Sequence, residues 1–370
     1  MRGRSEWPRR AGRALLALAG LIVALCTVEL VARTRVGLPN AWMLVGTPAW
    51  YDTGIFQPDR ELMQVLRPGA VGHFRTPEFH TTVRISATGH RGEGLGAREA
   101  GELRILAVGD SFTLAAQVEE EDSFAARVAQ QLAATLQRPV RVVNAGVDGY
   151  GTGQAARYAR RLAAQVQPDL ILLTFFLGND LGDNRSFRPD TYADQAAPLP
   201  SLLSPADRRW GWSAVYLHWS AWQRSRRLAQ DPAMNHHRSQ VRLFAARADL
   251  RSEAEATGAA LQELSAVARE LGVPARIALA PPAFALRDED TARALEMFGL
   301  PDSPDPTAPA RLVAGLIPAG IPALDLRPAL VAAEEEGRTY FIFDGHWNRH
   351  GHEAVADALV PFLSAALVPP

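Results

Sequence analysis

The chain has 370 residues, of which 47% are hydrophobic and 21% are charged, as expected for one sizeable globular domain with additions. Its formal net charge is −1, so it lacks the basic excess of a nucleic-acid-binding protein. The sequence contains no lysine, which excludes Schiff-base chemistry, a P-loop lysine and a Ser–Lys dyad.

The N-terminus is basic and leads into an apolar run from Ala14 to Val28, which resumes after Glu29. The run reaches about 19 residues, roughly the minimum that spans a bilayer, and no small-residue cleavage site follows it. Basic residues stay on the cytoplasmic side of a membrane. We therefore expect residues 1–35 to be a cytoplasmic basic tail and a signal anchor, with a cleaved signal peptide as the alternative. The single cysteine, Cys26, lies in this run, so the rest of the chain has no disulfide and no thiol nucleophile.

Residues 36–100, which we call the collar, follow the apolar run. The sequence from Gly37 to Phe79 is irregular, with scattered proline, glycine and aromatic residues. His80 to Ser86 is rich in Thr, Val and Ile and therefore predicts a strand. We expect the collar to be an ordered linker that contains this strand.

Residues 101–370 alternate between short apolar runs and segments with helical periodicity. This alternation predicts a mainly parallel sheet with helices on both faces, which is a three-layer α/β/α domain. Asp122 or Ser123 is the expected N-cap of the first long helix. Residues 181–250 break the pattern and form an insertion rich in Trp and Arg. The expected strands cover 104–108, 140–143, 169–176, 275–280 and 322–326, and the expected helices cover about 124–136, 153–165 and 254–271 and start again near 349.

The first three expected strands each end in a polar turn that contains glycine. These turns are Gly109-Asp110-Ser111, Asn144-Ala145-Gly146 and Gly178-Asn179-Asp180. Because the carboxyl ends of parallel strands meet at one edge of the sheet, the three turns should lie close together. The sequence therefore predicts a functional site at that edge.

Ser111 and His346 are the candidate nucleophile and base of this site. Ser111 sits in a tight turn between a buried strand and a helix, and a serine nucleophile needs a nearby base. His346 precedes the last helix, and Asp344 lies two residues earlier, where it could orient the imidazole. The alternatives are an N-cap role for Ser111 and a surface histidine at 346. A metal site that uses the i, i+4 pair His346 and His350 is a further alternative.

An oxyanion needs hydrogen-bond donors, and three groups at the strand ends could provide them. These are the backbone N–H groups of Ser111 and Gly146 and the side-chain amide of Asn179. The alternatives are a turn glycine at 146 and a turn asparagine at 179.

These motifs resemble the four blocks of the SGNH (GDSL-like) hydrolases, in the same order, from about residue 104 to the C-terminus. The resemblance implies a flavodoxin-like fold and acyl-ester chemistry without a cofactor or metal. It implies Ser111 as nucleophile, His346 as base and Asp344 as orienting acid. It also implies an oxyanion hole made by the Ser111 N–H, Gly146 and Asn179.

The Asp344-Gly345-His346-Trp347 block is one residue shorter than the common Asp-x-x-His spacing. It is similar to the block in exopolysaccharide O-acetylation proteins, although there the block precedes the serine. The N-terminal anchor resembles that of bacterial family members whose catalytic domain lies in the periplasm, attached to the inner membrane. We therefore expect a serine-dependent esterase or deacetylase.

Two other functions remain open at this stage. One is an O-acetyltransferase that modifies exopolysaccharide or cell-wall glycan, with a membrane acyltransferase as its partner. The other is a non-catalytic carbohydrate-binding or scaffold protein. The substrate would be an acyl ester or a carbohydrate, and Trp210 and Trp212 of the insertion could stack on sugar rings. The alternative for these tryptophans is packing within the insertion.

Overall fold

The structure is a computed structural model in which the chain divides into two compact units. One unit consists of residues 1–49 and 201–231, and the other consists of residues 50–200 and 232–370. The residues whose structure is described are 7–45, 54–75, 78–188, 210, 213, 215–216, 219, 232–300, 302–342 and 344–367.

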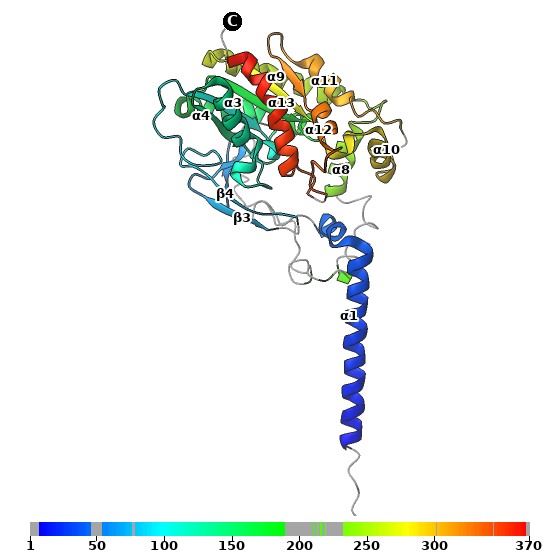
Figure 1. Ribbon diagram of the computed structural model, residues 1–370. Helices are drawn as coiled ribbons and strands as arrows, with labels where there is room; N and C mark the ends of the chain where they lie inside the picture. The colour runs from blue at the N-terminus through cyan, green and yellow to red at the C-terminus, as the bar shows by residue number, and fades with distance from the viewer. Residues whose placement is uncertain are drawn as a thin grey trace, which may run out of the picture. The chain divides into compact units, whose positions relative to one another are not determined.

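The first unit is built on helix α1 (Trp7–Val45), which is drawn in blue in Figure 1. Its segment Leu15–Ala32 is long and apolar enough to cross a membrane, and such a segment serves either as an anchor or as a signal sequence. Glu29 interrupts the apolar run, and its carboxylate accepts hydrogen bonds from the Ser213 hydroxyl (2.8 Å) and the Val215 N–H (3.3 Å). Part of the insertion thus pairs with the polar residue of this helix.

The second unit contains a central sheet of five parallel strands in the order β6-β5-β7-β8-β9. The predicted parallel sheet is therefore confirmed. Gly109 at the end of β5 lies opposite Gly146 of β6 and Thr174 of β7, so the three strand ends are in register. The strands are β5 (Leu103–Gly109), β6 (Val140–Gly146), β7 (Leu170–Phe176), β8 (Ala275–Ala280) and β9 (Ala323–Asp325).

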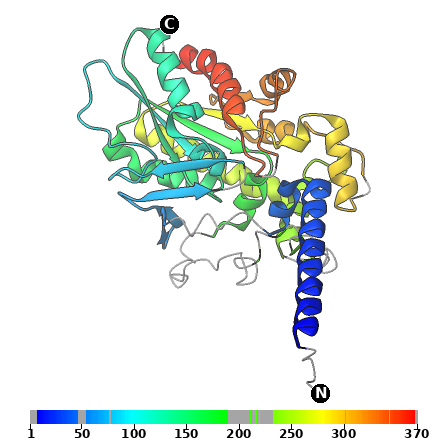
Figure 2. The same ribbon diagram turned by 60° about the horizontal axis from the view of Figure 1, so that its bottom comes forward.

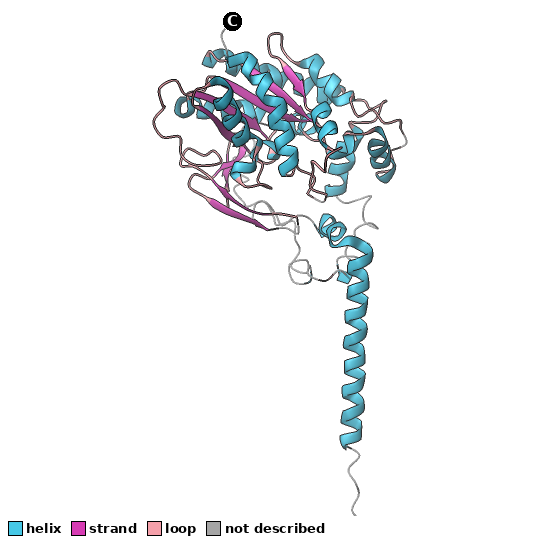
Figure 3. Ribbon diagram, viewed as in Figure 1, coloured by secondary structure: helices cyan, strands magenta, loops and turns pink. Residues whose placement is uncertain are grey.

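Helices cover both faces of this sheet, and Figure 3 shows the magenta strands between cyan helices. Alternate residues of one strand serve the two cores, because Leu170 and Leu172 pack on one face and Ile171 and Leu173 on the other. One face carries α3 (Phe124–Leu136), α12 (Arg327–Ala333) and α13 (Arg349–Leu367), and the other carries α4 (Thr152–Val166), α9 (Arg251–Leu271) and α11 (Ala308–Leu316) (Figure 1).

The N-terminal end of α3 follows the expected signal. Ser123 caps α3, since its hydroxyl accepts a hydrogen bond from the Ala126 N–H at 3.3 Å. This result decides between Asp122 and Ser123. The smaller elements of this unit are α2 (Ser111–Leu114), η2 (Glu120–Asp122), α5 (Asp180–Ser186), α8 (Pro232–Arg242), η3 (Ala283–Ala285) and α10 (Asp288–Met297).

The collar contains more strands than the sequence predicts. The expected strand is present as β4, but the segment expected to be irregular from Gly37 begins with the end of helix α1, which runs to Val45, and holds three other strands. They form two antiparallel hairpins, β1 with β2 and β3 with β4, and Figure 2 shows β3 and β4 as adjacent light-blue arrows. Each strand has only four or five residues, too few for a clear alternating pattern. The strands are β1 (Phe56–Asp59), β2 (Met63–Leu66), β3 (Val71–Arg75) and β4 (His80–Arg84).

Candidate active site

Ser111 begins a single helical turn directly after strand β5. The Asp110 carboxylate caps this turn by accepting the Phe112 N–H at 2.9 Å. The turn ends at Ala115, which has a left-handed conformation with φ of 56°. Ser111 is only 6% exposed, and its position at the strand end points its hydroxyl toward the loop before α13.

The structure brings Ser111, His346 and Asp344 together in one chain of hydrogen bonds. His346 Nε2 lies 2.7 Å from the Ser111 Oγ, and His346 Nδ1 lies 2.7 Å from the Asp344 Oδ1. Asp344 Oδ1 also accepts the backbone N–H of His346 at 3.3 Å. The His346 ring packs on Phe112, with ring centroids 4.6 Å apart. The distances and order of this arrangement suit proton transfer from a serine to a histidine.

The environment of His346 favours a basic imidazole. Burial lowers the pKa of His346, but the charge and the hydrogen bond of Asp344 raise it. The nearby carboxyl groups of Asp110 and Asp148 raise this pKa further, and the net effect places it above the ordinary value of 6.5. Asp344 therefore both orients the ring and stabilises its protonated form.

Buried carboxyl groups surround the strand ends. Burial raises the pKa of Asp110 to about 7, although the Phe112 N–H and the His346 charge oppose this change. Burial and the charges of Asp110 and Asp148 raise the pKa of Asp183 to about 8. The pKa of Asp180 is also raised, mainly by burial. Burial therefore favours the neutral, protonated form of these carboxyl groups.

Gly146 does not fit its predicted role as an oxyanion donor. Its N–H already donates to the Asn144 Oδ1 at 3.1 Å. A Cβ at this position would lie 2.2 Å from the Leu114 nitrogen, so glycine is needed here for close packing of β6 against α2. The structural requirement therefore explains this glycine.

Gly149 offers a backbone donor that sequence reasoning missed. Its φ is +74°, and an added Cβ would meet no atom within 4 Å, so the residue faces open space. Within the described part of the chain, its N–H has no hydrogen-bond partner. Its neighbour Asp148 is close enough to influence His346 electrostatically. The sequence does not show the positive φ of Gly149. The glycine itself was the signal that could have pointed to this position.

Asn179 lies just beyond β7 and precedes α5. Its carbonyl oxygen accepts the N–H groups of Gly182 (2.8 Å) and Asp183 (2.9 Å), which fixes the turn. Its side chain makes no capping hydrogen bond, so the amide remains available as a donor among the described residues. The stacked rings of Phe112 and Phe176, with centroids 3.9 Å apart, join the ends of β7 and β5.

The collar contributes buried contacts to the nucleophile turn. Arg91 is 4% exposed, and its guanidinium donates to the carbonyl oxygens of Leu114 (2.8 Å), Ala115 and Val118 (2.6 Å). Thr81 donates its hydroxyl hydrogen to the next carbonyl, that of Ala116, at 2.6 Å. Sequence reasoning missed both residues, because they lie outside the expected catalytic domain.

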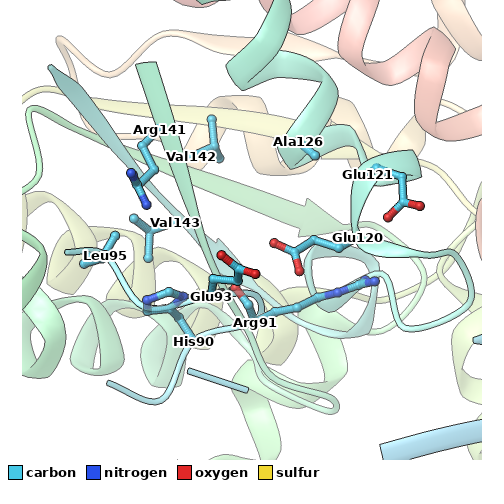
Figure 4. Close-up of a pocket in the computed structure, with 10 residues that line it drawn as sticks. All are labelled: His90, Arg91, Glu93, Leu95, Glu120, Glu121, Ala126, Arg141, Val142 and Val143. Carbon is cyan, nitrogen blue, oxygen red and sulfur yellow. Dashed lines mark hydrogen bonds between the residues drawn. The ribbon is translucent and has the colours of Figure 1, made fainter. Parts of the chain in front are cut away.

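A cavity of about 430 Å³ lies beside Arg91 (Figure 4). Collar residues including His90 and Glu93 line one part of it, and Arg141 of β6 and Glu120 line another. None of the three hydrogen-bonded residues Ser111, His346 and Asp344 lines it. The reaction site is therefore distinct from this cavity.

The remaining predicted site residues lie apart from this arrangement. His350 directs its Nε2 toward the carbonyl oxygen of Ala333 at 3.0 Å, so it does not pair with His346. Among the residues that the structure describes, no group of three or more His, Cys, Asp or Glu is arranged to hold a metal. Trp210 belongs to the unit that contains α1 and is 46% exposed, and Trp212 lies outside the described residues.

Comparison with known proteins gives one family match. Residues 107–300 match the model of the GDSL-like lipase/acylhydrolase family. No curated protein sequence matches the chain.

Several solved structures are similar to this chain at low sequence identity. An α/β hydrolase enzyme, LAE5, from the metagenome of Lake Arreo, Spain, is 15% identical with a TM-score of 0.39, covering 72% of this chain and 97% of its own. Axe2, an acetylxylan esterase from Geobacillus stearothermophilus, is 15% identical with a TM-score of 0.39. The match covers 70% of this chain and 93% of Axe2. A G-D-S-L family lipolytic protein from Veillonella parvula is 14% identical with a TM-score of 0.37. The match covers 71% of this chain and 98% of that protein.

Replacing Asp110 should change how stability depends on pH. The pKa of this carboxyl rises from 3.8 to about 7 on folding, so the folded protein holds an extra proton between these values. Stability should fall as pH rises through this window, because the buried group must then ionise. Asp110→Asn keeps an acceptor for the Phe112 N–H but cannot ionise, so it should remove part of this fall in stability at higher pH. Urea denaturation at pH 4.5, 6 and 8 should show the variant gaining stability relative to wild type, whereas a constant difference would contradict the assignment.

Arg91→Met should destabilise the fold strongly. The substitution leaves the carbonyl oxygens of Leu114, Ala115 and Val118 buried without their donor. Each unsatisfied group costs about 1–3 kcal/mol, so we expect a total loss of about 3 kcal/mol or more. Arg84→Met, which removes an exposed arginine from the same collar, is the control and should change stability by less than about 0.5 kcal/mol. Equal urea midpoints for the two variants would show that the Arg91 hydrogen bonds do not stabilise the fold.

Proposed function

Because the chain belongs to the GDSL-like lipase/acylhydrolase family, we propose that it is a serine-dependent hydrolase of acyl esters. The observation that carries this proposal is the pair of 2.7 Å contacts that link Ser111 to His346 and His346 to Asp344. These residues lie at the carboxyl edge of the sheet, where α/β folds place their reactive groups.

The reaction begins with neutral His346. Its Nε2 takes the Ser111 hydroxyl proton while the Ser111 Oγ attacks the ester carbonyl carbon. The tetrahedral intermediate collapses, the C–O bond to the alcohol breaks, and His346 returns the proton to the leaving alkoxide. Water then attacks the acyl-serine with His346 again as base, which releases the carboxylic acid and restores Ser111. Asp344 stabilises the imidazolium in each half of the cycle.

Three donors would stabilise the oxyanion. They are the Ser111 N–H at the start of α2, the side-chain amide of Asn179, and the Gly149 N–H in place of Gly146. Two observations support this choice: the Gly149 N–H has no partner among the described residues, and an added Cβ at Gly149 would meet open space. Removal of one such donor typically costs about 10²–10³ in kcat.

The substrate is an ester without charge near its carbonyl, such as an acetyl ester on a cell-surface carbohydrate. The burial of the site supports an uncharged ester. Ser111 is only 6% exposed, and burial favours the neutral forms of Asp110 and Asp183, so a charged group would lose its hydration there without a partner. The basic N-terminus and the apolar segment Leu15–Ala32 support a single-pass protein of the bacterial inner membrane with its catalytic unit in the periplasm.

Loss of the nucleophile or base should abolish turnover. With the full chain in detergent micelles and p-nitrophenyl acetate as substrate, Ser111→Ala or His346→Ala should lower kcat by about 10⁴-fold or more. Ser364→Ala, which removes a hydroxyl bonded only to its own helix at Val360, is the control and should keep wild-type turnover. Turnover that survives Ser111→Ala in a folded protein would refute the proposed chemistry.

The pH profile should report His346. Activity requires the neutral imidazole, and the pKa of His346 is raised above 6.5, so kcat/KM should fall as pH decreases through a value above 6.5. Asp344→Asn should move this midpoint downward as well as lowering kcat, because the carboxylate raises that pKa. The same assay with added oligosaccharide acceptors separates hydrolysis from transfer, since a transferase would form an acetylated sugar in place of acetate.

A further inference from the structure

The collar reaches the loop that carries Asp344 and His346 through one carboxylate. Glu78 lies between β3 and β4, and its Oε1 accepts the Ile342 N–H at 2.6 Å. Its Oε2 accepts the Asp344 N–H at 2.9 Å. One side chain therefore holds two backbone donors of the same loop, both of which a carboxylate can satisfy simultaneously.

This contact acts on two described residues near the tip of the loop, Ile342 and Asp344. Ile342 is 52% exposed, and Gly345 has a φ of +81°, so the loop tip is a turn at the surface. At the base of the loop, the Phe341 N–H donates to the His346 carbonyl oxygen at 2.9 Å. For the tip, the described backbone hydrogen bonds to another part of the chain are those to Glu78. The Phe79 and Phe341 rings, with centroids 5.1 Å apart, pack beside them.

Glu78 thus extends the hydrogen-bonded chain of the site by one member. Its Oε2 fixes the Asp344 backbone, the Asp344 Oδ1 holds the His346 Nδ1, and the His346 Nε2 faces the Ser111 Oγ. The Asp344 side chain branches from the backbone that Glu78 holds. A shift of this backbone would change the direction in which the Asp344 carboxylate meets the imidazole.

We propose that Glu78 is a positioning residue, which sets the rate of acyl transfer by holding Asp344 in the orientation that serves His346. This role rests on the proposed function of Ser111 and His346. Glu78 does not touch the reacting atoms. Its effect should therefore appear in kcat and depend on the presence of Asp344, whereas KM should remain unchanged.

Two variants test the geometry of the carboxylate. Glu78→Gln keeps the length of the side chain but has one oxygen acceptor, so one of the two N–H groups loses its partner. Glu78→Asp keeps the charge and both oxygens but is shorter by one methylene. Glu99→Gln, an exposed carboxylate of the same collar, is the matched control. All variants are made in the full chain and assayed in detergent with p-nitrophenyl acetate.

The readout separates positioning from stability. Titration with an organophosphate such as diethyl p-nitrophenyl phosphate counts the sites with a reactive Ser111, so kcat is expressed per competent site and unfolded protein does not contribute. We expect Glu78→Gln and Glu78→Asp to lower this kcat by about 10–100-fold with KM within about twofold, as small misplacements of catalytic groups do. Glu99→Gln should match wild type.

A double-mutant cycle gives the decisive comparison. If Glu78 acts through Asp344, Glu78→Gln should lower kcat by less than about threefold further in an Asp344→Ala background, because coupled residues are not additive. An unchanged kcat per site in the single variants would overturn the proposal. The proposal would also fail if Glu78→Gln lowered kcat by the same factor in the Asp344→Ala background as in the wild-type protein. Turnover that survives Ser111→Ala would instead refute the proposed function, and the role of Glu78 would fall with it.

Discussion

A buried guanidinium, that of Arg91, holds the turn that begins at Ser111 in place. Helix α2 has only four residues, so it cannot stabilise itself by its own backbone hydrogen bonds. The carbonyl oxygens that it leaves at its C-terminal end are satisfied by Arg91 and Thr81 of the collar. Burial lowers the pKa of Arg91 to about 10, and the residue therefore stays charged at neutral pH. The collar from residue 50 onward thus belongs structurally to the unit that contains Ser111, although it precedes the sheet in the chain.

The polar residues at the strand ends fall into two groups, which differ in whether their hydrogen-bonding groups already have partners within the fold. Asn144 connects three segments, since its amide donates to the Thr113 carbonyl at 2.7 Å, its Oδ1 accepts the Gly146 N–H, and its backbone carbonyl accepts the Arg91 N–H. Its hydrogen-bonding capacity is thereby used within the fold. Asn179 and Gly149 instead keep donors without partners among the described residues. Residues of the first group build the edge of the sheet, and those of the second can meet a substrate.

The sequence predicted the sheet because its strands are continuous apolar runs. It pointed to Ser111 because the carboxyl ends of parallel strands meet at one edge, and to His346 because Asp344 lies two residues earlier in the loop before the last helix. It could not separate Gly146 from Gly149, since that distinction depends on whether a neighbouring side chain occupies the N–H group. The collar escaped prediction for a different reason. Its strands are short, and Glu78 and Arg91 have partners far away in the chain, so no local pattern marks them.

The distance along the chain between these partners has a consequence for biogenesis. Glu78 and Asp344 are 266 positions apart, so their contact closes a loop that contains all five strands of the central sheet. Contacts of such high sequence separation form late in folding, because their entropic cost must first be offset by other structure. During synthesis, the collar therefore leaves the ribosome long before the loop to which Glu78 binds. The Glu78 contact, and any activity that depends on it, can form only after nearly the whole chain has been made.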